Sequence, residues 1–199
     1  MKKILLVGLA MGWLTISLAG VVHAGMIGVS EIKVFSALTP PAESYLQICE
    51  LIATETGTGI DVALASNGAT ATSTSNWDQQ TNPGKAIDGI YPGDYPNLWH
   101  SATNSATEYL DVMLSVPKEL DSITIYGRNS YSDRDVFNVY AYDSKGNQLF
   151  AGLNASANNA NHYVTLTFPN TPVPEPSSML LLATGLAGLA GIRFRRKKQ

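Results

Sequence analysis

The chain has 199 residues, of which 45% are hydrophobic, and a net charge of −3; this size predicts one domain with appendages. From Gly25 to Pro172 there are 15 acidic and 6 basic side chains, a surface that repels phosphate backbones and argues against nucleic acid as a partner. Cys49 is the single cysteine, which excludes an intrachain disulfide.

Residues 1–24 have the three-part layout of a secretory signal peptide. Two lysines precede an apolar run that begins at Ile4, and small residues lead to an expected cleavage site near Ala24. The alternative is an uncleaved membrane anchor, which fits less well because the apolar run is short for a membrane span. The N-terminus therefore predicts export.

Residues 25–170 are predicted to form an all-β domain. Short runs with alternating or β-branched and aromatic residues occur there in place of a long helical period. The expected strands are Ile27 to Phe35, Tyr45 to Ala53, Tyr109 to Leu114, Ser122 to Tyr126, Val136 to Tyr142 and His162 to Phe168. Turn-forming residues separate these runs, which favours an antiparallel jelly-roll sandwich. Residues 67–76 are small and polar, which predicts a loop or a sheet edge.

The stretch KAIDGIYPGDYPNLWHS, residues 85–101, combines turn-forming, acidic and aromatic residues. The Asp-Gly turn at 88–89 can aim a carboxylate and backbone carbonyls at one point, which suits Ca²⁺ because that ion takes about six to eight oxygen ligands. Tyr91, Tyr95 and Trp99 can form a rim that stacks on sugar faces. In the alternative, which is favoured for Trp99, that residue lies in the core and the tyrosines cover it. Both alternatives are open for the tyrosines.

Five motifs resemble the discoidin family, which includes the coagulation-factor C-type domains and galactose-binding-like modules. In chain order they are KAIDG (85–89), LWHS (98–101), EYLDVML (108–114), ITIYGR (123–128) and RDVFNVYAYDSKG (134–146). The resemblance implies a jelly-roll sandwich of about eight strands with ligand-binding loops at one end and, usually, a structural calcium. The segment YLQICELIATE (45–55) resembles the strand that normally closes the family's domain. Because it comes first here, we expect it to pair back into the sheet.

The resemblance also implies a calcium site. Its ligands would be the side chains of Asp88 and Glu50, the carbonyls of Lys85, Ile90 and Cys49, and Ser101 or a near neighbour.

A sugar site is the second feature that the resemblance implies. Arg128 and Arg134 stand where fucose-binding members of the family carry their arginines. Tyr91, Tyr95 and His100 complete the expected ligand-binding set.

The sugar site departs from the fucose-binding pattern in two ways. The family's histidine position falls near Asn104, and its adjacent cysteine pair is replaced by the Ser-Tyr pair at 130–131. Fucose specificity is therefore not implied, although arginine forks suit hydroxyl pairs and carboxylates, so acidic and neutral glycans are both open. In the alternative without a ligand, Arg128 forms an ion pair with Asp133 or Asp135 at a strand end.

The C-terminal segment divides into a Pro-Glu-Pro linker, residues 171–178, and an apolar run with a basic end, residues 179–199. As a helix, the apolar residues 179–192 extend about 21 Å at about 1.5 Å per residue, less than a hydrocarbon core of about 30 Å. The sequence therefore predicts a transient membrane insertion, with the basic end on the cytoplasmic side. These three parts resemble the PEP-CTERM sorting signal of Gram-negative bacteria. The resemblance implies an exosortase as partner and a final location at the cell surface, in the envelope or in the extracellular matrix.

The sequence supports three functions to different degrees. The favoured one is a non-catalytic module that binds surface or extracellular polysaccharide. The alternative is a structural matrix or surface protein without ligand binding. An enzyme is the least supported, because the sequence has no G-x-S-x-G, no H-E-x-x-H and no phosphate loop.

Overall fold

The computed structural model describes residues 25–39 and 44–168. The expected signal peptide, the Pro-Glu-Pro linker and the C-terminal apolar helix lie outside these residues, so their structure stays a prediction. Within the described ranges, no helix is long and apolar enough to cross a membrane.

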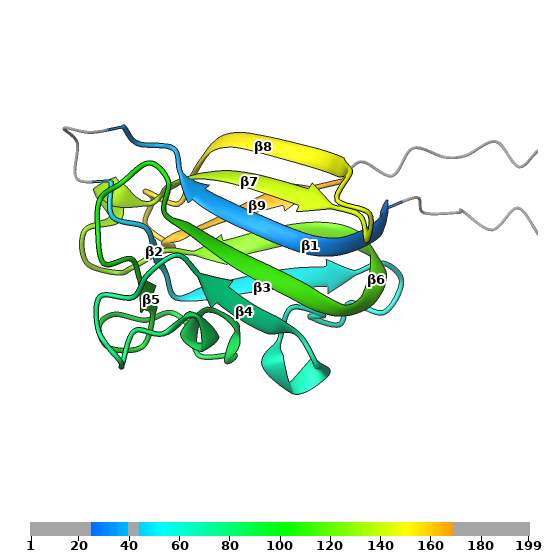
Figure 1. Cartoon of the computed structure of the whole chain (residues 1–199), viewed down its shortest axis with the longest axis horizontal. Helices are drawn as coiled ribbons and strands as arrows, with labels where there is room; N and C mark the ends of the chain where they lie inside the picture. Colours follow the sequence, from blue (N-terminus) through cyan, green and yellow to red (C-terminus); the bar gives the residue numbers. More distant parts are fainter. Residues whose placement is uncertain (1–24, 40–43, 169–199) are drawn as a thin grey trace, which may run out of the picture. The chain divides into compact units, whose positions relative to one another are not determined.

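The described part of the chain is all-β, as predicted, and its strands pair antiparallel (Figure 1). The strands are β1 (Met26–Ser36), β2 (Gln47–Ile48), β3 (Glu50–Glu55), β4 (Thr70–Ser73), β5 (Trp99–His100), β6 (Tyr109–Tyr126), β7 (Val136–Tyr142), β8 (Gln148–Ser156) and β9 (Tyr163–Thr167). Three short 3-10 turns join them: η1 (Ala65–Asn67), η2 (Pro83–Ile87) and η3 (Ser132–Arg134).

The long strand β6 organises the fold because its two halves have different neighbours. Its first half lies between β1 and β4, and its second half lies between β3 and β9. β7 and β8 continue the sheet beyond β1. The alternation of buried and exposed residues in β6 breaks around Val116 and Pro117, and proline cannot donate to a ladder. The strand changes neighbours there, and the arrangement is consistent with a β-sandwich.

The core lies on the inward faces of these strands. Alternate residues of β1, β6 and β7 are buried, as their period of two requires. Trp99 and Phe137 are the largest side chains that are fully enclosed. Trp99 therefore belongs to the core, as expected. Its indole N–H donates to the Ser75 carbonyl at 3.1 Å, which satisfies its polar atom.

Several strands differ from the sequence predictions. The two strands expected between Tyr109 and Tyr126 are one continuous strand, and neither β5 nor β8 was predicted as a strand. The run from Tyr45 to Ala53 divides at Cys49 into β2 and β3. β3 does pair back into the sheet, on the second half of β6, as the early position of this strand led us to expect.

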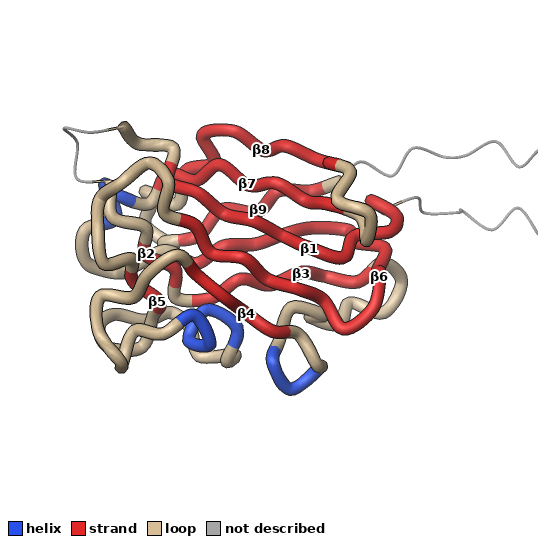
Figure 2. The backbone as a smooth tube through the Cα atoms, viewed as in Figure 1, coloured by secondary structure: helices blue, strands red, loops and turns tan. Residues whose placement is uncertain are grey.

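The short strands β2 and β5 pair with each other away from the main sheet. They lie at the end of the domain opposite the bend of β6, and loops and 3-10 turns gather around them (Figure 2). This end of the domain carries the candidate site.

Candidate functional site

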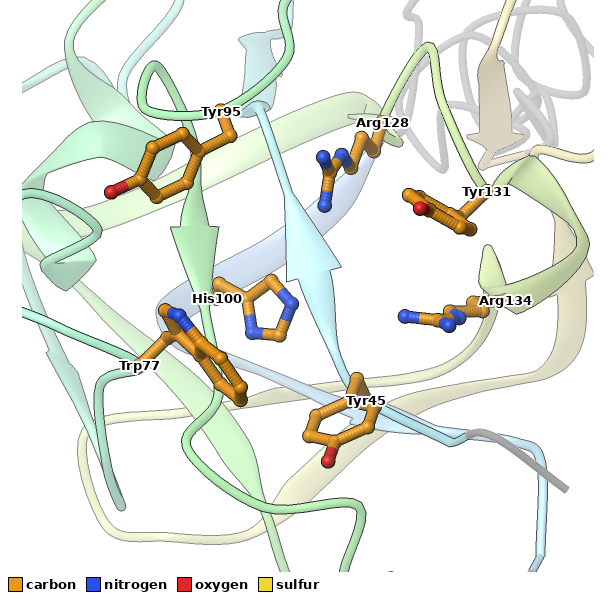
Figure 3. A pocket seen from close by; sticks show the side chains of 7 residues that line it. All are labelled: Tyr45, Trp77, Tyr95, His100, Arg128, Tyr131 and Arg134. Carbon is orange, nitrogen blue, oxygen red and sulfur yellow. The ribbon is translucent and has the colours of Figure 1, made fainter.

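A pocket of about 390 Å³ opens at this loop-rich end (Figure 3). It is lined by Tyr45, Trp77, Tyr95, His100, Arg128, Tyr131 and Arg134. Its volume lies within the range of about 300–1,000 Å³ that is usual for small-molecule sites. Four of the five residues that the sequence analysis assigned to ligand binding lie together here: Tyr95, His100, Arg128 and Arg134.

Arg128 is held by an acidic partner at the edge of the pocket. Its Nε donates to Asp94, and Ser130 donates to the other oxygen of the same carboxylate. Partial burial opposes ionisation of Asp94, but the hydrogen bonds from Ser130, the Tyr95 backbone and Arg128 keep its pKa below the usual value. The partner of the Arg128 side chain is thus Asp94, and neither Asp133 nor Asp135.

Asp135 instead holds the backbone of Arg128. Its Oδ2 accepts a hydrogen bond from the Arg128 N–H at 2.9 Å, and its side chain is fully buried. Burial raises the pKa of Asp135 to about 8. A Cβ atom at Gly127 would lie 2.1 Å from the same carboxylate oxygen, so glycine at this position leaves the space that Asp135 occupies.

Arg134 lies between two aromatic rings. Its guanidinium carbon is 4.6 Å from the centre of the Tyr131 ring and 5.5 Å from that of Tyr45. Tyr131 also contacts Arg128, whose guanidinium carbon is 5.0 Å from the ring centre. Tyr131 has a φ of 63°, a conformation that is uncommon for a residue other than glycine and often marks a functional site. Cation–π contacts of this kind position both guanidinium groups.

The opposite wall is an aromatic cluster of Tyr45, Trp77 and His100. The His100 ring centre is 5.4 Å from that of Tyr45 and 5.2 Å from that of Trp77. His100 Nδ1 lies 2.7 Å from the Ser101 carbonyl and therefore donates to it, while Nε2 accepts from Gln47 Nε2 at 2.8 Å. Burial lowers the pKa of His100, so the neutral ring is favoured. This histidine thus has a positioning role in the wall.

The loop that carries Tyr95 is tied to both sides of the pocket. The Tyr95 hydroxyl donates to Asp78 at 2.8 Å, and the Gly93 carbonyl accepts from the Asn129 N–H at 3.1 Å. Tyr91 lies elsewhere: its ring centre is 4.2 Å from that of Tyr126 on β6, so it is not part of the pocket lining.

Sequence reasoning missed Tyr45, Trp77 and Tyr131 as lining residues. Tyr131 lies between the two arginines in the chain, which was a usable signal. Tyr45 and Trp77 come from segments that are distant in sequence, and the sequence alone does not show that they meet at 6.0 Å between ring centres.

The residues expected to bind calcium lie partly together. Glu50 Oε2 accepts from the Gly89 N–H at 3.0 Å. Burial raises the pKa of Glu50 to about 8, and repulsion from the charge of Asp88 adds to the shift. Lys85 Nζ is 3.6 Å from Asp88 Oδ2, and the Ile90 N–H donates to Asp88 Oδ1 at 3.0 Å.

Ser101 and Cys49 are the remaining residues of the expected calcium site, Cys49 through its backbone carbonyl. The Ser101 hydroxyl accepts from the Leu46 N–H and donates to the Thr103 carbonyl. The Cys49 thiol is buried, which raises its pKa to about 12 and makes it unreactive.

The chemistry around Glu50 fits a cation. Its Oε1 is buried and has no hydrogen-bond partner among the described residues, and a carboxylate in this state is costly without a compensating charge. In the described ranges, no group of three or more His, Cys, Asp or Glu side chains could hold a metal ion. A calcium ion here would need backbone carbonyls as further ligands.

The fold and the pocket define a class: an antiparallel β domain whose loops form a binding pocket at one end. Comparison with known families is consistent with this class. The F5/8 type C domain matches residues 69–174, just over half of the chain, and the PEP-CTERM protein-sorting motif matches residues 172–197. No curated protein and no solved structure matches the chain.

The chain therefore belongs to the F5/8 type C, or discoidin, family and ends in a PEP-CTERM sorting motif. That motif indicates an exported protein sorted to the surface. Tyr45 and Glu50 precede the matched residues, although they take part in the pocket and the candidate calcium site.

Proposed function

We propose that this protein is a non-catalytic glycan-binding module, exported and sorted to the bacterial surface, where it binds surface or extracellular polysaccharide. The observation that carries the proposal is the pocket itself. It places two guanidinium groups among five aromatic rings at the loop end of a domain whose family consists typically of binding modules.

The chemistry of the pocket suits a sugar. Aromatic rings pack against the apolar C–H faces of a pyranose, and Trp77 has 55% of its surface exposed for such a contact. Guanidinium groups donate in pairs to neighbouring oxygens, and the contacts with Asp94 and Tyr131 fix where Arg128 presents its donors. Orientation before binding lowers the entropic cost of complex formation.

A calcium ion would stabilise the same end of the domain, and we include it in the proposal as a structural ion. Glu50 and Asp88 would supply carboxylates, and the Lys85, Ile90 and Cys49 carbonyls would add neutral oxygen ligands. Because Glu50 opens β3 and Asp88 follows η2, the ion would join two segments that are distant in the chain. Its support is the buried Glu50 oxygen without a partner.

The function is tested by a glycan array probed with the full-length chain in mild detergent, followed by calorimetry of the strongest binder. We expect millimolar to micromolar affinity, and Arg134→Ala should weaken it about tenfold or more, as expected for the loss of a charge-assisted hydrogen bond. Lys145→Ala, in the turn between β7 and β8, is the matched control and should bind like the native protein. An array and calorimetry that both stay at background would instead favour a structural surface protein.

A further inference from the structure

We infer that the pocket selects a saccharide that carries a carboxylate, of the uronate class, over its neutral counterpart. The inference rests on the proposed glycan-binding function and concerns the same pocket.

The first support is the distribution of charge. Between Gly25 and Pro172 the chain has only two arginines, Arg128 and Arg134, and both line the pocket. The same segment is acidic overall, yet none of the seven lining residues is Asp or Glu. The two carboxylates that contact lining residues are already engaged, Asp94 by Arg128 and Ser130 and Asp78 by the Tyr95 hydroxyl. The concentration of guanidinium donors at one place in an acidic domain matches an anionic ligand.

The second support is the orientation of Arg128. Asp94 binds Nε, at one side of the guanidinium, and the backbone of Arg128 is fixed by Asp135 and by the pairing of residue 128 with Gly93. Figure 3 shows the end of the Arg128 side chain directed into the pocket. The planar fork of guanidinium donors matches the two oxygens of a carboxylate, which a single hydroxyl does not.

The third support is the setting of Arg134. Its guanidinium projects into the pocket from η3, between the rings of Tyr45 and Tyr131 (Figure 3). A ligand carboxylate can lie between Arg128 and Arg134 while its sugar ring packs against the aromatic wall.

The test compares matched ligands on the full-length chain in mild detergent. Oligomers of galacturonate, glucuronate and mannuronate are titrated by calorimetry beside the same oligomers after reduction of the carboxyl groups to alcohols. We expect at least one uronate to bind about tenfold or more tightly than its reduced form, and the difference should shrink as salt is raised.

Two variants locate the selectivity. Arg134→Gln should bring the acidic and reduced forms to within about twofold of each other, since it removes one guanidinium. Lys145→Gln removes one positive charge far from the pocket in sequence and should leave the preference intact. A sulfated neutral oligosaccharide is titrated as the third class of ligand, beside the uronates and their reduced forms. If it binds more tightly than every uronate, the pocket does not select a carboxylate.

The outcomes separate this inference from the proposed function. If neutral or reduced oligomers bind as tightly as the acidic ones, the uronate inference is wrong and glycan binding stands. If the array and calorimetry detect no glycan at all, both are wrong.

Discussion

Asp135 is a buried carboxyl group whose protonation is linked to the stability of the fold. Its Oδ2 accepts from the Arg128 N–H, whereas Oδ1 has no hydrogen-bond partner among the described residues. Burial raises its pKa from 3.8 to about 8. The folded protein therefore retains a proton that the unfolded chain releases above about pH 4.

This difference gives a pH prediction with a defined sign. Between about pH 4 and pH 8 the folded state binds more protons than the unfolded state at Asp135, so the free energy of unfolding falls as the pH rises through this window. Asp135→Asn keeps the acceptor and removes the titration. Urea unfolding at several pH values should show a shallower decline for this variant than for the native protein. Parallel curves for the two proteins would contradict the assignment.

The turn after β6 is the element that joins the sheet to the pocket. Gly127 directly follows β6, and the buried carboxyl group of Asp135 occupies the space where a side chain at this position would lie. The residue that follows, Arg128, thereby leaves the strand with its backbone already fixed. The position of Arg128 thus depends on a glycine that is not among the residues lining the pocket.

Gly127→Ala should destabilise the protein by about 1–3 kcal/mol, because the new methyl group must displace Asp135. In an Asp135→Ala background the obstruction is gone, so the same substitution should cost much less. Chemical denaturation of the four proteins of this double-mutant cycle measures the coupling. Additive effects would show that Gly127 and Asp135 do not share the space.

The strands illustrate what the sequence could predict and what it could not. The alternation in Val136–Tyr142 predicted β7 because one face of that strand is buried and the other is not. β8 lacks this alternation, since most of its residues are exposed and only Gly152 and Ala155 are buried, so no period marked it. The continuity of β6 across Pro117 was hidden for a related reason, because its middle residues are exposed.

The residues of the candidate site also divide into those that the sequence could predict and those that it could not. Arg128, Arg134, Tyr95 and His100 could be named from motifs, since each lies in or beside a stretch that resembles the family. Tyr45 and Trp77 could not, because their place in the wall follows from the pairing of β2 with β5 and from loops without a local signature. The partner of Arg128 was missed because Asp94 is 34 residues away in the chain.

At the scale of the whole molecule, a calcium ion would tie the start of β3 to the segment that follows η2 and so stabilise the native state. Excess Ca²⁺ should raise the melting temperature, since a ligand of the folded state adds about 2.7 kcal/mol at a hundred times its Kd. Glu50→Gln and Asp88→Asn should each abolish the response in thermal scans of the full chain with Ca²⁺ or a chelator. The control Asp143→Asn, in the exposed turn after β7, should keep it. A Ca²⁺ response that survives both site variants would place the ion elsewhere.

The central claim is that a glycan binds in the pocket between the arginines and the aromatic wall, and Trp77 allows it to be observed there. This residue is the exposed tryptophan of the pocket, whereas Trp99 is buried in the core. Titration of the full chain with the strongest binder of the array should produce a saturable change in tryptophan fluorescence, with the same Kd as calorimetry. In Trp77→Phe, which retains an aromatic ring, the fluorescence change should disappear while calorimetric binding persists. Glycan binding that leaves the fluorescence of the native protein unchanged, or an equal change in Trp77→Phe, would contradict binding in this pocket.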